Sequence, residues 1–329
     1  MSEPSASEIL IDLSTAILRV DEGRLECRLI APQDNAPRLP FGPFMPDRHR
    51  TMEIGLRQWV REQVGVELAL VEQLYTFADQ GRDARDHGLH TVSVGYLALS
   101  APGPATPAPA QSDPWGAIYD CFPWEDWRDG RPRLLDDTII PALDKWLKKA
   151  EHASERVRLA FARDGAQWDE EFVLERYELL YEAGLVQEAA RDRHGPTGTH
   201  AGPHTASRAQ PISAQLGVML QLDHRRILAT ALGRLRSKLK YRPVIFDLMS
   251  DAFTLRQLQE TTEQVMGVKL HTQNFRRLVE KSGFVVATGR TVKARGRPAE
   301  VFRFRHNERA ERPLSGLRVS SRGSAQNLS

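Results

Sequence analysis

The first hundred residues alternate between apolar and polar positions in a way that predicts a small α+β domain. Residues 9–20 are rich in β-branched and aliphatic side chains, and residues 24–30 alternate apolar with polar positions. The turn sequence at 21–23 between them predicts a β-hairpin. Residues 52–63 have helical periodicity and predict a helix that ends near Gly65, because glycine tolerates the left-handed conformation of a C-cap.

Two further strands are predicted at 68–77 and 91–99, on either side of a polar loop at 79–88. The Ala/Pro-rich stretch 101–114 follows. Because proline lacks the backbone donor that helices and strand ladders need, this stretch predicts a linker or a surface loop.

Residues 115–192 are predicted to be a mainly helical insert. Apolar side chains recur at helical spacing over 134–150 and 168–190. The polar, Gly/Pro/His-rich stretch 193–215 then predicts a flexible loop, with metal binding by its histidines as the alternative. The insert also has an aromatic cluster for which we expect packing rather than a ligand platform: Trp115, Tyr119, Phe122, Trp124 and Trp127.

The next segment predicts two helices in succession. Residues 223–240 form an amphipathic pattern in which the basic side chains mostly lie off the apolar stripe. A second helix over 255–265 is predicted from Thr254 as N-cap, Gln257 at the capping-box position and Gly267 as C-cap.

A third helix and a hairpin complete this region. Residues 271–282 predict a helix with Thr272 as its N-cap, and residues 284–288 and 299–305 predict two strands around a basic tip at 289–298. Two helices joined by a glycine turn and followed by a basic hairpin are typical of a winged helix-turn-helix domain.

Charge is distributed unevenly along the chain. The net charge is only +2, yet residues 225–306 contain 18 Lys and Arg against 6 Asp and Glu, so the remainder is acidic. A basic module on an acidic body favours binding of a polyanion, although a solvated basic surface is the alternative. There is no apolar run of transmembrane length and no signal-peptide pattern, and Cys27 and Cys121 lack metal-ligand spacing. We therefore expect a cytoplasmic protein with two ordinary thiols, no metal site and no membrane contact.

The third helix of the basic module has the chemistry of a DNA-recognition helix. A helix fits the major groove, where Gln and Asn pair with adenine and Arg pairs with guanine or phosphate. The wing should follow phosphates or enter a narrow minor groove. A winged helix used for protein contacts is the alternative. The candidate residues for binding double-stranded DNA are Thr272, Gln273, Asn274, Arg276, Arg277, Lys281, Arg290, Lys293, Arg295 and Arg297.

Two stretches of the chain resemble the Nudix-related transcriptional regulators of NAD metabolism, the NrtR type. The C-terminal resemblance is carried by NFRR at Asn274–Arg277 and GRPA at Gly296–Ala299, and the N-terminal one by the segment Gln73–Leu99. It covers residues 8–100 and 220–306 and omits the helical insert. The resemblance implies a Nudix-like α/β/α sandwich joined to a winged helix-turn-helix domain.

The glutamates that Nudix hydrolases need for Mg²⁺ are mostly missing. With Gly65-Val66 as anchor, the Glu-Glu pair of the motif falls on Glu62 and Gln63, the Arg-Glu pair on Gln58 and Trp59, and the upstream Glu on Arg50. One carboxylate is a poor site for a hard cation, so we expect no hydrolase activity. A shifted register that uses Glu53 is the alternative.

The resemblance also implies a nucleotide effector, ADP-ribose or an NAD-related compound, and a homodimer that changes its DNA affinity when the effector binds. The candidate ligand residues are Arg38, Arg82, Arg85 and Glu62, and a plain salt-bridged turn is the alternative for the loop around Arg82. No cofactor is expected.

The predicted function is thus a repressor of genes for NAD biosynthesis or salvage. Its rivals are a divergent Nudix pyrophosphohydrolase with a nucleic-acid-binding tail and an adaptor that contacts proteins. The predicted domains are 1–100 (Nudix-like), 101–114 (linker), 115–192 (helical insert), 193–215 (flexible loop), 220–306 (winged helix) and 307–329 (flexible tail).

Overall fold

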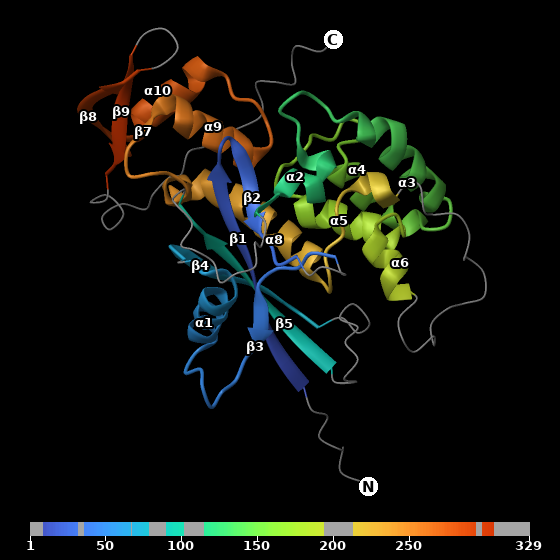
Figure 1. Cartoon of the computed structure of the whole chain (residues 1–329). Helices are drawn as coiled ribbons and strands as arrows, with labels where there is room; N and C mark the ends of the chain where they lie inside the picture. Colours follow the sequence, from blue (N-terminus) through green and yellow to red (C-terminus); the bar gives the residue numbers. More distant parts are fainter. Residues whose placement is uncertain are drawn as a thin grey trace.

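The computed structural model describes residues 9–31, 36–66, 68–78, 90–101, 115–193, 213–293 and 298–305. Within these residues a mixed sheet, a group of helices and a small second sheet lie next to one another (Figure 1). No helix in these described ranges is long and apolar enough to cross a membrane. The predicted linker 101–114, flexible loop 193–215 and tail 307–329 lie mostly or wholly outside the described residues, as do His194, His200 and His204.

The larger sheet confirms the predicted hairpin and the two strands that follow the first helix. The order of its strands is β4-β5-β1-β2-β6, and β3 pairs with β1. Strands β1 and β5 are parallel, and the other pairs are antiparallel. The six strands are β1 Ile9–Asp21, β2 Arg24–Arg28, β3 Phe41–Pro43, β4 Leu70–Phe77, β5 His90–Leu99 and β6 Trp115–Ala117.

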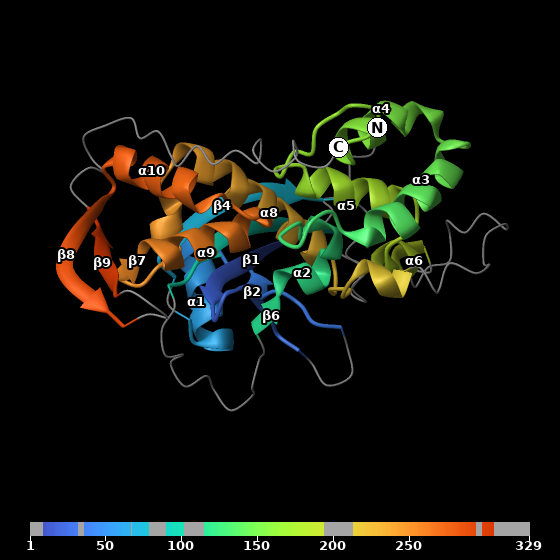
Figure 2. The same cartoon turned by 90° about the horizontal axis from the view of Figure 1, so that it is seen from above.

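Helices cover both faces of this sheet, as the predicted α/β/α sandwich requires. Helix α1 (Met52–Val64) packs on one face, where Leu13 and Ile17 of β1 are fully buried. It ends at Gly65 in the left-handed conformation, as predicted. The opposite face, which carries Ala16 and Leu18, packs against α8 (His224–Tyr241) (Figure 2). The helical layer on this second face of the sheet therefore comes from a helix that lies more than a hundred residues after the last strand of the sheet in the sequence.

The helical segment is more broken than its periodicity predicts. The expected helix 134–150 is a π-helical turn, Leu135–Ile139, followed by α3 (Ile140–Leu147). The expected helix 168–190 is also two helices, because Gly184 adopts a left-handed conformation (φ 71°) that ends the first of them. The remaining helices here are α2 Ile118–Cys121, α4 Ser154–Ala160, α5 Val173–Glu182 and α6 Gln187–Arg193.

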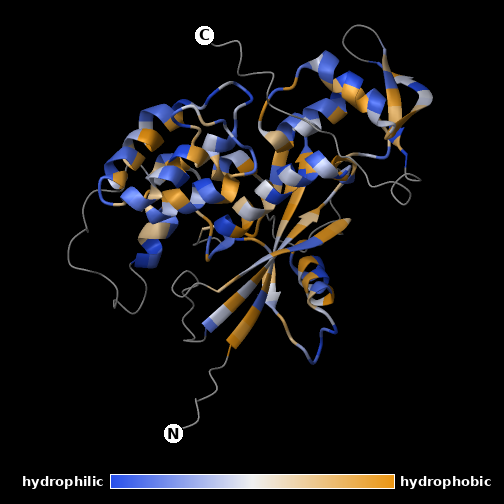
Figure 3. Cartoon of the chain, turned by 180° about the vertical axis from the view of Figure 1, so that it is seen from behind, coloured by the Kyte–Doolittle hydropathy of each residue, from blue (hydrophilic) through white to orange (hydrophobic). Residues whose placement is uncertain are grey.

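The aromatic cluster of this segment serves packing, as expected. Phe122 and Trp124 are fully buried, with their rings edge to face at 5.9 Å. Trp115 stacks under the guanidinium of Arg19 at 4.0 Å. Hydrophobic residues predominate in the large sheet, whereas hydrophobic and hydrophilic residues alternate along the helices (Figure 3).

Helix α8 is buried on nearly all sides, which the sequence does not reveal. It contacts the large sheet, α5 and α9 (Leu255–Met266). Two of its arginines are therefore in the interior: Arg225 is 1% exposed and Arg236 is 0% exposed. Both are paired with buried glutamates, because an unpaired charge in the interior is very costly.

The C-terminal region folds as the predicted winged helix. Thr254 and Gln257 form the complete capping box of α9, and Gly267 is its left-handed C-cap. Helix α10 (Thr272–Ser282) begins one residue earlier than the predicted cap allows, so His271 rather than Thr272 is the N-cap. The small sheet has the order β7-β9-β8, with β7 Phe253–Thr254, β8 Val285–Val292 and β9 Ala299–Phe304.

Candidate functional site

Helix α10 presents one apolar and one polar face. Phe275 and Val279 are 3% and 0% exposed and anchor the helix on the winged helix core. All six of the residues that the sequence singled out on this helix are exposed: Thr272, Gln273, Asn274, Arg276, Arg277 and Lys281.

The cations of this face are not engaged elsewhere in the described part of the chain. No hydrogen bond or ion pair with a described residue holds Arg276, Arg277 or Lys281. Thr272 accepts a hydrogen bond from Nε2 of Gln259, at 3.3 Å, which ties the start of α10 to α9. The guanidinium groups are therefore available to an external anion.

The wing adds further positive charge beside this helix. Strand β8 continues to Val292, beyond the predicted end at 288, so Arg290 lies in the strand and not in the tip. Arg290 and Lys293 are both exposed. Arg295 and Arg297 lie outside the described residues.

Helix α1 uses the positions of the Nudix glutamates to hold strand β3. The amide of Gln63 accepts from the backbone N–H of Phe41 at 3.2 Å and donates to its carbonyl at 2.6 Å. The indole of Trp59 donates to the carbonyl of Pro43 at 3.0 Å. Both side chains are thus used as backbone anchors.

The remaining carboxylates of α1, Glu53 and Glu62, do not form a cluster that could bind a metal ion. Glu62 is exposed and accepts a hydrogen bond from Gln58 at 2.8 Å. Glu53 forms an ion pair with Arg57 at 2.9 Å. No cluster of three or more His, Cys, Asp or Glu side chains suited to a metal ion occurs within the described residues.

Arg38 lies beside the large sheet, near the start of α8. Its backbone pairs with that of Ile30, and its guanidinium lies 5.1 Å above the ring of Phe41. The Nε atom of Arg38 is buried without a hydrogen bond in the described part of the chain. The other two predicted ligand arginines, Arg82 and Arg85, are outside the described residues.

A buried polar group next to Arg38 was missed by reasoning from the sequence. Nδ1 of His224 accepts from the backbone N–H of Leu39 at 3.1 Å, and its Nε2 lies 3.4 Å from Oγ of Ser14. Asp12 and Ser93, neighbours in the parallel pair of β1 and β5, are 0% and 7% exposed. The sequence did contain a signal for this buried group, because Asp12 and Ser14 are polar residues within the largely apolar strand β1.

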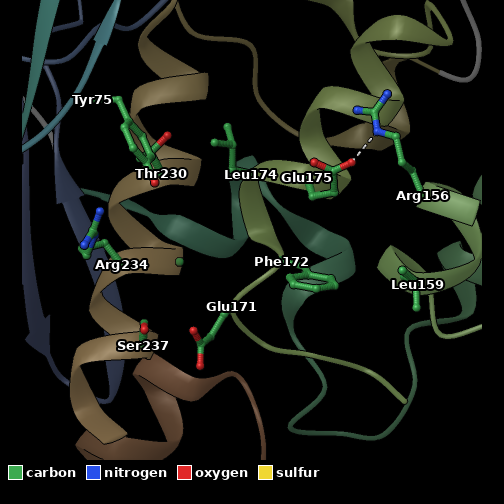
Figure 4. Close-up of a pocket in the computed structure, with 11 residues that line it drawn as sticks. Tyr75, Arg156, Leu159, Glu171, Phe172, Leu174, Glu175, Thr230, Arg234 and Ser237 are labelled. Atoms are coloured by element: carbon green, nitrogen blue, oxygen red, sulfur yellow. Dashed lines mark hydrogen bonds and ion pairs between the residues drawn. The ribbon is translucent and has the colours of Figure 1, made fainter. Parts of the chain in front are cut away.

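A surface groove of about 560 Å³ lies between β4, α4, α5 and α8 (Figure 4). Three exposed apolar side chains, Tyr75, Leu159 and Phe172, line it together with Arg156 and Arg234. None of the described residues that the sequence proposed for ligand binding lines this groove.

Comparison with known proteins identifies the C-terminal module. Residues 245–304 match the family model of the NrtR DNA-binding winged helix domain. The ADPR responsive transcriptional repressor NtrR of Acinetobacter baylyi is 38% identical over 85 residues, which are 26% of this chain and 34% of that protein. The match thus spans about a third of the length of this curated relative.

Solved structures resemble nearly the whole chain. The crystal structure of Shewanella oneidensis NrtR complexed with a 27mer DNA has a TM-score of 0.54 at 18% identity, covering 90% of this chain and 93% of that one. A second crystal structure of Shewanella oneidensis NrtR has a TM-score of 0.53 at 18% identity, with 90% and 94% covered. At this identity the likeness concerns the fold. The predicted resemblance is therefore confirmed for the winged helix domain, which matches the NrtR family model, and the fold of the chain as a whole is like that of Shewanella oneidensis NrtR.

Proposed function

We propose that this protein is a transcriptional repressor that binds operator DNA in the cytoplasm through α10 and the wing. The observation that carries the proposal is the polar face of α10, on which Arg276, Arg277 and Lys281 are exposed and have no partner in the described residues. The match of residues 245–304 to a DNA-binding winged helix family supports it. A winged helix used only for protein contacts has no need of this unpaired positive charge.

Helix α10 and the wing are proposed to make different contacts with DNA: α10 contacts bases, and the wing contacts phosphates. Gln273 and Asn274, at the amino-terminal end of α10, are placed to pair with adenine in the major groove. Arg276 and Arg277 pair with guanine or with phosphate oxygens. Arg290 and Lys293 of the wing, with Arg295 and Arg297, neutralise phosphates and contribute affinity without base specificity.

The proposed effector is ADP-ribose or an NAD-related nucleotide, held by the Nudix-like domain. The Acinetobacter baylyi relative is named as ADPR responsive, which supports this choice. Arg38, with its buried Nε, is our candidate for a diphosphate oxygen, together with Arg82, Arg85 and Glu62. The genes under control are then those of NAD biosynthesis or salvage.

We propose further that the nucleotide is bound without hydrolysis. Gln63 and Trp59 are committed to strand β3, and Glu62 stands alone among the positions of the motif, so a Mg²⁺ cage is not assembled on α1. Release of AMP from ADP-ribose in the presence of Mg²⁺, abolished by Glu62→Ala, would contradict this part of the proposal.

The switch requires two copies of the chain. We infer a homodimer whose two winged helices contact the two halves of an operator. The effector changes DNA affinity only if it binds the DNA-compatible and the incompatible arrangements with different affinities.

Fluorescence anisotropy with duplex DNA from the region upstream of the protein's own gene tests the proposal, with and without ADP-ribose or NAD. We expect sequence-preferring binding that depends on salt and on the nucleotide. The double variant Arg276→Ala, Arg277→Ala should lose at least about tenfold in affinity, since each good base contact contributes ~1–3 kcal/mol. Unchanged affinity in that variant would remove α10 from the interface.

A further inference from the structure

A buried carboxylate joins three separate parts of the molecule. Glu125 is 1% exposed, and the two arginines that bind it, Arg176 and Arg236, are 0% exposed. Arg176 donates to its two oxygens at 2.5 and 2.9 Å, and Arg236 donates to Oε2 at 2.7 Å. Glu125 belongs to a 3-10 turn of the helical segment, Arg176 to α5 and Arg236 to α8.

Arg236 and two residues close to Glu125 in the sequence bind the carboxyl end of α9. The last carbonyls of a helix have no partner within the helix. Here Nε of Arg236 donates to the carbonyl of Val265 at 2.9 Å, and the hydroxyl of Tyr119 donates to that of Gln264 at 2.5 Å. The backbone N–H of Trp127 donates to the carbonyl of Gly267 at 2.7 Å. Two helix-terminal carbonyls and the C-cap carbonyl are therefore satisfied by groups from outside α9.

A side-chain contact reinforces this attachment. Arg128 donates to the amide oxygen of Gln264 and forms an ion pair with Asp126 at 2.6 Å. Four residues bind the end of α9, and the pair of Glu125 and Arg176 holds Arg236 in place. We call these six residues the α9 clamp: Tyr119, Glu125, Trp127, Arg128, Arg176 and Arg236.

The α9 clamp packs closely against the C-cap of α9. Gly267 has φ +70°, and a Cβ atom there would collide with the carbonyl of Glu125, Nη2 of Arg236 and the hydroxyl of Tyr119. A glycine is needed at this C-cap both for its backbone conformation and for the close approach.

The end of α9 controls where α10 begins. The chain from Gly267 to Thr272 is the turn of the helix-turn-helix. Glu263 accepts from the backbone N–H of Leu270 at 3.0 Å, and Gln259 donates to the carbonyl of Leu270 at 3.0 Å. Because this turn is tied to α9, any rotation of α9 moves the DNA-reading face of α10 with it.

Glu125 is held ionised in this interior. Burial acts to raise the pKa of Glu125, but Arg176 and Arg236 outweigh burial and lower it. A buried ion pair often contributes little net stability compared with apolar packing, but loss of one partner is costly. Its geometric specificity is the more useful property here, because all three charge-assisted bonds to the carboxylate have fixed directions.

We propose that Glu125 is a positioning residue for DNA recognition, and that the helical segment serves to orient the winged helix through the α9 clamp. The DNA part of this proposal rests on the proposed function above. The segment binds the carboxyl end of α9 through Tyr119 and Trp127, so it acts on α10 through α9.

Amide hydrogen exchange on the full chain tests the clamp without DNA. The variants are Glu125→Gln, Tyr119→Phe and Arg128→Ala, and the control is Arg156→Ala, which breaks the exposed pairs with Glu175 and Glu182 in the same segment. We expect exchange over 255–282 to rise about fivefold in Tyr119→Phe, the factor for one hydrogen bond of ~1 kcal/mol. Exchange in β1 and β5 should stay unchanged, and the control should leave all of these regions as in the wild type.

Operator affinity is measured on the same proteins. We expect Glu125→Gln to bind about tenfold more weakly than wild type, a loss that ~1.4 kcal/mol produces, with the dependence on salt unchanged because every side chain that faces phosphate is still present. Should Glu125→Gln fail to fold, Tyr119→Phe and Arg128→Ala decide the matter. Unchanged exchange in α9 overturns the proposal, and so does faster exchange with unchanged affinity. If wild type binds no duplex at all, the proposed function is wrong, and exchange alone then decides whether the clamp holds α9.

Discussion

Arg236, in the C-terminal half of α8, donates from Nε to the backbone carbonyl of Val265 at the end of α9, at 2.9 Å. At the other end of the same helix, His224 accepts from the backbone of Leu39 beside the large sheet. These two positions are twelve residues apart, which corresponds to about 18 Å along a helix. A single buried helix therefore contacts both the neighbourhood of the proposed effector site and the DNA-binding module.

The wing should contribute affinity but little base specificity. Replacing Arg290 and Lys293 with alanine removes two exposed cations, so operator and unrelated duplexes should weaken to a similar degree. The slope of log K against log salt should fall by about 0.9 for each phosphate that the variant no longer neutralises, as measured by anisotropy over a salt series.

Arg131→Ala is the control for loss of a surface cation away from the wing, because Arg131 pairs with Asp136 in the helical segment. It should leave both affinity and slope unchanged. A wing variant that binds the operator more weakly but unrelated duplexes as well as before would assign base contacts to the wing.

Gly267→Ala should destabilise the protein more than Gly23→Ala. Both glycines have similar positive φ angles, +70° and +73°, so each substitution incurs the left-handed backbone strain of ~1–2 kcal/mol. A Cβ at Gly23 has no atom within 4 Å, whereas one at Gly267 collides with the α9 clamp. Urea unfolding monitored by tryptophan fluorescence measures the stability of both variants. Equal losses of unfolding free energy would show that the α9 clamp can move to accommodate a Cβ atom at position 267 at little cost.

Ionisation of Glu125 should make stability depend on acid pH. The folded-state pKa of Glu125 is below its ordinary value of 4.5, so its contribution is present above pH 4.5 and is lost as pH falls through the lower folded-state value. Glu125→Gln abolishes this titration. We expect the difference in unfolding free energy between wild type and Glu125→Gln to be constant near neutral pH and to shrink over the interval in which the pH falls below 4.5. A difference that is independent of pH over that interval would mean that Glu125 is not paired as an ion.

Much of the local structure could be predicted from the sequence because its determinants are local. Thr254 and Gln257 specify the start of α9 by a capping box within four residues of each other, and Gly267 and Gly283 end α9 and α10 in left-handed turns. The exposed cations of α10 were likewise evident, since the periodicity of Phe275 and Val279 determines which face is outside.

Contacts between distant segments could not be predicted in this way. The sequence pattern places Arg225 and Arg236 on the surface of an amphipathic helix, yet both are buried, because α8 has neighbours on all sides. Their partners Glu188 and Glu125 lie 37 and 111 residues away, and no spacing rule connects them.

The sequence by itself determined four of the six strands of the large sheet (β1, β2, β4 and β5), the helices of the winged helix domain, the loss of most glutamates from the Nudix motif, and the polar side chains that α10 exposes. Only the tertiary structure decided that α8 forms the second layer over the sheet and that the helical segment holds the end of α9. The physical reason is that caps and periodicity act over a few residues, whereas a buried charge is placed by whichever distant groups can compensate it.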